Sequence, residues 1–75
     1  MSVNDLVDLV DLIKSGRARQ LRESAGISAS NLARDLEVTT GAVIRWETGE
    51  RTPRGANARR YARALRRLAA RAAAS

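Results

Sequence analysis

The chain has 75 residues, a formal net charge of +6, and neither cysteine nor histidine. This length builds one small domain, and the composition excludes disulfides, thiolate or imidazole metal sites, and catalysis that needs Cys or His. With no long apolar run and an acidic beginning, the sequence predicts neither a membrane span nor a signal peptide. We therefore expect a cytoplasmic, non-enzymatic protein without cofactor, metal or small-molecule substrate.

The charge is distributed very unevenly along the chain. Residues 1–13 carry three Asp and no basic residue, whereas residues 51–75 carry eight Arg and no acidic residue. A GC-rich genome would also favour Arg over Lys. Positive charge gathered in one half of a small domain is nevertheless typical of a protein that binds a polyanion such as DNA.

Residues 1–15 predict an acidic amphipathic helix. We expect an apolar side formed by Val3, Leu6, Val7, Val10 and Ile13. Asp5, Asp8 and Asp11 are expected on the other side. The three Asp line up along the helix rather than converge, which favours a solvated face over a metal site. Leu9 and Leu12 widen the apolar surface. This helix therefore either covers the core or makes a dimer contact.

The next predicted helix spans residues 17–25 and ends at Gly26, with Ala18, Leu21 and Ala25 on its apolar side. Residues 28–48 then predict a helix-turn-helix. In its first helix, Leu32, Ala33 and Leu36 share one face, and Ser28 is placed to cap the first turn.

The second helix of the motif is predicted over residues 40–48, with Thr39 or Thr40 at its N-cap. Val43, Trp46 and Glu47 share one face at about 100° per residue. The opposite face carries Gly41, Ile44, Arg45 and Thr48. A short helix with small, apolar and cationic side chains facing outward fits the major groove of DNA.

Residues 17–54 resemble the helix-turn-helix domain of the phage repressor and Cro family, also called the XRE family. The matching positions are Arg17, Arg22, Ser28, Leu32, Ala33, Val38, Thr39, Thr40, Val43, Trp46, Glu47, Thr48, Gly49, Arg51 and Pro53. The resemblance implies duplex DNA binding and an ion pair between Arg22 and Glu47. The chain departs from the family pattern at Glu37, where Gly is usual in the turn, and at Ala29, where Gln is frequent. Glu37 would then have to adopt a left-handed or bent backbone.

Residues 49–55 form a loop whose likeness to the family implies that Arg51 and Arg54 contact phosphates. The last helix is predicted over residues 56–73. Its apolar face is expected to comprise Tyr61, Leu65, Leu68, Ala69 and Ala72, flanked by Ala58 and Ala62. The arginines on the other side form either a solvated face or a source of long-range attraction to DNA.

The sequence as a whole predicts an all-α, compact five-helix bundle, with residues 1–75 in one helix-turn-helix DNA-binding domain and no sheet. Base readout is assigned to Thr40, Gly41, Ile44 and Arg45, with Arg45 forming a bidentate contact to guanine. Contacts to the phosphates are assigned to Ser28, Ser30, Thr39, Thr48, Arg51 and Arg54.

These features predict a sequence-specific transcriptional regulator, a small phage or prophage repressor of immunity or Cro type, that acts at the nucleoid of a bacterial or phage-infected host cell. A homodimer on a palindromic operator would place half-sites about 34 Å apart. Two alternatives remain open. One is an antitoxin-like protein-interaction module that also represses its own operon. The other is a nonspecific nucleic-acid binder, recognised by sequence-independent affinity and a steep salt dependence.

Overall fold

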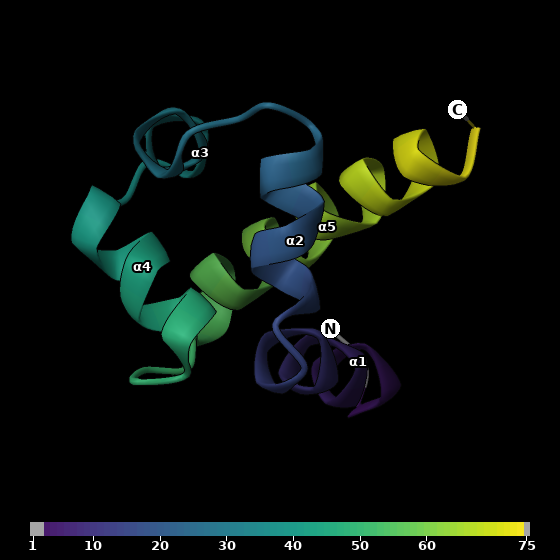
Figure 1. Cartoon of the computed structure of the whole chain (residues 1–75). Coiled ribbons are helices and arrows are strands. Elements are labelled where there is room, and N and C mark those ends of the chain that lie inside the picture. Colours follow the sequence, from purple (N-terminus) through teal and green to yellow (C-terminus); the bar gives the residue numbers. More distant parts are fainter. Residues whose placement is uncertain (1–2, 75) are drawn as a thin grey trace.

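A computed structural model describes the backbone of residues 3–74 and the side chains of residues 7–74. The described part contains five helices and no strand, which confirms the predicted all-α bundle. In order, they are α1 (Val3–Lys14), α2 (Arg17–Ser24), α3 (Ala29–Leu36), α4 (Thr40–Thr48) and α5 (Gly55–Ala74). Figure 1 shows α5 crossing behind α2, with α3 and α4 to one side and α1 below.

The helix ends follow from local chemistry. Ser28 and Thr39 have extended backbones, and their hydroxyl oxygens accept hydrogen bonds from the N–H groups of Asn31 and Ala42, which satisfies orphan donors at the starts of α3 and α4. Helix α3 ends at Glu37, which has a left-handed backbone with φ of 59°. The bent backbone expected at this position is therefore present in the residue that replaces the usual Gly.

The core lies where α5 packs against the other helices. Tyr61, Leu9, Leu65 and Val43 are the largest fully buried side chains. The rings of Trp46 and Tyr61 lie 5.1 Å apart between centroids, at an angle of 39°. This contact joins α4 to α5 within the tilted geometry that aromatic pairs favour.

The inward face of α1 differs from the prediction. Leu9 and Ile13 are buried and Leu12 is half-buried, whereas Val7 is 51% exposed. Leu9, predicted to lie at the margin, is at the centre, because α1 is rotated so that its i, i+4 pair Leu9 and Ile13 faces the core. The side chains of Val3, Leu6 and Asp5 lie outside the described residues.

The apolar face of α5 is also shorter than predicted. Ala58, Tyr61, Ala62, Leu65 and Leu68 are buried, but Ala69 and Ala72 are exposed. The last turns of α5 extend away from the other helices in Figure 1, and the apolar period continues there beyond Leu68, the last buried residue of the helix. The predicted inward position of these two alanines was wrong for that reason.

Candidate nucleic-acid interface

Helix α4 is fixed by its inner side and exposes its outer side. On the inner side, Val43 is completely buried and Trp46 is nearly so, as the predicted pattern requires. On the outer side, Ile44 is 48% exposed, and Arg45 is also exposed. Burial of an apolar side chain contributes about 1.5–3 kcal/mol, so Val43 and Trp46 hold the helix in place while Ile44 is left available for contact.

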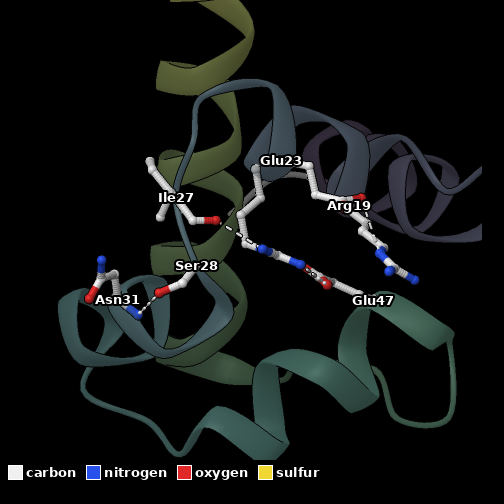
Figure 2. A network of polar contacts seen from close by, with 7 residues as sticks. Arg19, Glu23, Ile27, Ser28, Asn31 and Glu47 are labelled. Atoms are coloured by element: carbon white, nitrogen blue, oxygen red, sulfur yellow. Dashed lines mark hydrogen bonds and ion pairs between the residues drawn. The ribbon is translucent and has the colours of Figure 1, made fainter.

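Glu47 is a buried acid on the same inner side, and it is paired. Its carboxylate accepts two hydrogen bonds from Arg22, at 2.6 Å from Nε and 3.0 Å from Nη2. The Nη1 group of Arg22 donates to the carbonyl of Ile27 at 2.8 Å. The ion pair implied by the family resemblance is therefore present (Figure 2), and it ties α2 to α4 and to the segment before α3.

The electrostatics of this pair follow from its burial. Only 12% of the Arg22 side chain and 4% of the Glu47 side chain are exposed. The hydrogen bond to Glu47 raises the pKa of Arg22, although burial acts in the opposite direction. Removing one partner from such a buried pair typically costs about 3–5 kcal/mol, because the other charge is left uncompensated.

Tyr61 lies near this pair, but its hydroxyl differs from the two charged groups in its hydrogen bonding. Its hydroxyl is buried and has no hydrogen-bond partner within the described part of the chain. Burial raises the pKa of Tyr61 far above its ordinary value, and the negative charge of Glu47 raises it further. The phenol is therefore neutral in the folded protein, and it contributes through its ring rather than its hydroxyl.

The first turns of α3 and α4 are brought together. The hydroxyl of Thr40 donates to the hydroxyl oxygen of Ser30 at 3.3 Å, although the two residues are ten positions apart. Ser28 and Thr39 cap the two helices with their oxygens, as described above, which leaves each hydroxyl hydrogen available to a phosphate. These four hydroxyl residues thus surround two helix N-termini, whose dipoles favour negative charge.

Arg45 lies along the surface of its own helix. A Cβ atom added to Gly41 would lie 3.1 Å from Nη1 of Arg45, and Nε of Arg45 lies 3.8 Å from a carboxylate oxygen of Glu50. The space beside Gly41 is therefore occupied by the guanidinium, which is at the end of a flexible side chain. A larger residue at position 41 would therefore displace the Arg45 side chain even in the absence of DNA.

Thr48 has an internal role that the sequence did not reveal. Its hydroxyl donates to the carbonyl of Arg45 at 3.2 Å and accepts from the N–H of Glu50 at 3.4 Å. Its only hydroxyl hydrogen is therefore engaged at the end of α4. In this structure the Thr48 hydroxyl therefore stabilises the helix terminus, and the phosphate contact predicted for it stays a prediction.

The loop between α4 and α5 borders a hollow of about 660 Å³. Arg51 and Arg54 are exposed beside it, and Pro53 is buried and anchors the loop. Asn57, in the first turn of α5, also lines the hollow and was missed by the sequence analysis.

The comparisons with known proteins agree with this geometry. A family model described as helix-turn-helix matches residues 19–68, which is two thirds of the chain. The chain belongs to the XRE-type helix-turn-helix family. No curated protein and no solved structure matched the chain.

Membership of the XRE family identifies a DNA-binding regulator, and this family is not a family of enzymes. Within the described residues, no helix is both long and apolar enough to cross a membrane. The same residues hold no cluster of three or more Asp, Glu, His or Cys side chains suited to a metal ion.

Proposed function

We propose that this XRE-type regulator reads a specific duplex sequence by placing α4 in the major groove. The observation that carries the proposal is the two-sided character of α4. Val43, Trp46 and the paired Glu47 fix one side, while Ile44 and Arg45 are exposed on the other. A helix whose orientation is fixed from behind presents its outer side chains in a defined register.

Each exposed group has a role suited to its chemistry. Arg45 makes a bidentate contact to guanine, and Ile44 packs against a thymine methyl group. Thr40 bonds a base edge or a neighbouring phosphate, and Gly41 allows the backbone to approach the bases. The remaining contacts set the register on phosphates and come from Ser28, Ser30, Thr39, Arg51 and Arg54, with Thr48 supporting the loop.

The biological output of such binding is occupancy. A single small domain bound at a promoter excludes polymerase or a competing regulator, as a phage or prophage repressor of immunity or Cro type does. A homodimer on a palindromic operator would show two protected half-sites about 34 Å apart.

The experiment measures binding to DNA from upstream of the protein's own gene and to a scrambled duplex, at low and physiological salt. We expect a preference for the upstream DNA that survives physiological salt, since base contacts depend less on counterion release than phosphate contacts. Equal binding to both duplexes, lost as salt rises, would contradict sequence reading and support the nonspecific alternative.

Arg45→Ala tests the assigned base contact. We expect it to weaken binding to the upstream DNA by roughly 1–3 kcal/mol while leaving the scrambled duplex nearly unaffected. Arg59→Ala, which removes the same charge from an exposed position on α5, is the matched control. If both variants weaken binding equally on both duplexes, Arg45 contributes only charge.

A further inference from the structure

An open groove between α3 and α5, called here the α5 groove, has no part in the proposed DNA contacts. It has a volume of about 340 Å³. Its floor is apolar, and its rim is strongly basic apart from Asp35. The floor residues are Ile27, Leu32, Leu36, Ala64 and Leu68, and the rim residues include Arg60, Arg63, Arg67 and Arg71.

The outer face of α1 is the second surface without a role. Val7 is 51% exposed, and the other large hydrophobic residue exposed in the described part, Ile44, belongs to the DNA interface. Asp11 is exposed one turn after Val7 on the same face, whereas Asp8 lies at the edge of α1 beside Ala62 and Arg66 of α5. The α1 face thus combines an apolar side chain with a carboxylate, and the α5 groove combines an apolar floor with guanidinium groups.

The two surfaces lie on opposite sides of α5. α1 packs where Ala62 and Arg66 face it, and the α5 groove opens beside Ala64. Ala62 and Ala64 are two residues apart, which places them on opposite sides of a helix at about 100° per residue. Figure 1 likewise shows α1 and α3 on opposite sides of α5.

We propose that the α1 face of one copy docks into the α5 groove of a second copy, so that the chain associates head to tail. Charge complementarity between the acidic α1 face and the basic rim of the groove identifies a second copy as the occupant. Val7 would cover part of the apolar floor, and Asp11 would meet the arginines of the rim, while opposite charges also guide the encounter. This proposal does not depend on the DNA-binding proposal.

The contact has a consequence for assembly. Each copy uses two different surfaces, and these point in opposite directions. A pair of copies joined by one contact therefore still has an unused groove on one copy and an unused α1 face on the other. Such heterologous contacts form open chains or rings rather than closed two-fold dimers. The expected assembly therefore differs from the symmetric homodimer that a palindromic operator would require.

The test is analytical ultracentrifugation of the full chain without DNA, over a range of concentrations at low and high salt. We expect the average mass to rise with concentration past that of a dimer, and to return to the monomer in high salt as the charges are screened. A chain that stays monomeric throughout at low salt, or that stops at a salt-insensitive dimer, would overturn the proposal and leave the groove to a different occupant.

A charge swap identifies the surfaces. Asp11→Lys and Arg67→Glu each change an exposed residue, and each alone is expected to weaken association by roughly tenfold or more, because like charges then meet. An equimolar mixture should regain association, because the unchanged groove of Asp11→Lys can take the unchanged α1 face of Arg67→Glu, and the Lys of the first variant can meet the Glu of the second. Circular dichroism checks that both variants fold.

Arg59→Glu is the matched control, because it makes the same charge change on α5 outside the groove lining. It should associate like the wild type. A control as weakened as Arg67→Glu, or a mixture that stays monomeric, would show that the effect is not specific to these two surfaces and would contradict the docking contact. None of these outcomes depends on DNA affinity, so the two proposals can fail separately.

Discussion

Helices α4 and α5 both present arginine to solvent, but they are held in different ways. α4 has nine residues, and its inner side includes a buried acid that accepts two hydrogen bonds from Arg22. α5 has 20 residues and is held by an apolar stripe that includes Tyr61, Leu65 and Leu68. Hydrogen bonds to a charged group are directional, whereas apolar burial is not. α4 therefore has a directional constraint that the apolar stripe of α5 does not supply.

The largest expected effect comes from breaking the anchor of α5. Leu65 is fully buried, and Leu65→Ala should lower the free energy of unfolding by about 2–5 kcal/mol through lost burial and the cavity left behind. Urea denaturation followed by circular dichroism measures the change, with Leu65→Met as a volume-conserving control expected to cost less than about 1.5 kcal/mol. DNA binding should fall only in proportion to the unfolded fraction.

Removing Arg22, the α2 partner that anchors α4, should lower DNA binding by more than the loss of folded protein explains. Arg22→Ala is expected to destabilise the protein by about 3 kcal/mol, because Glu47 loses its partner. DNA affinity of the remaining folded protein should fall as well, since α4 loses its directional tie. If affinity per folded molecule is unchanged, the pair has a purely structural role.

Arg19→Ala is the control for that experiment. Arg19 pairs with Glu23 at 3.1 Å, but both side chains are more than half exposed. Such a surface pair contributes only about 0.2–0.5 kcal/mol, so stability and binding should hardly change.

Tyr61→Phe tests the contact between the two helices. It should raise the free energy of unfolding by about 1 kcal/mol, because it removes a buried hydroxyl without a partner and keeps the ring against Trp46. A decrease, measured by urea denaturation, would show that the hydroxyl has a partner in solution.

The same residue predicts a pH dependence. The pKa of Tyr61 is raised in the folded state, so the folded protein binds the proton more tightly than the unfolded chain does. Its contribution to stability is present in full below the ordinary tyrosine pKa near 10 and is lost as pH rises beyond that value. Thermal denaturation above pH 10 should therefore show a steeper loss of stability for the wild type than for Tyr61→Phe.

Apart from the Arg19 control, the smallest expected effect concerns the turn that leads into α4. Glu37 has a left-handed backbone, a conformation that costs a non-glycine residue about 1 kcal/mol. Its pair with Arg60, at 3.7 Å, is exposed and contributes little. Glu37→Gly should therefore raise the thermal midpoint slightly, and Glu37→Ala, which keeps the strain, should not.

Much of the DNA-binding half of the molecule could be predicted from the sequence. The bounds 40–48, the caps at Ser28 and Thr39, and the inward side of α4 depend on short-range periodicity and local hydrogen bonds, which neighbouring residues determine. The family pattern added the Arg22–Glu47 pair. The roles assigned to individual residues on DNA stay predictions.

Tertiary structure alone decided the remaining features. Residues 1–15 are apolar over too wide an arc for periodicity to choose an inward side, and packing against α2, α4 and α5 selected Leu9 over Val7. Ala69 and Ala72 keep the correct period, but both stay exposed beyond Leu68, the last buried residue of α5. The α5 groove also depends on residues of α3 and α5 that are brought together by folding. The sequence determines which sides of a helix are apolar enough to be buried. The helices that pack against it determine which of those sides is buried.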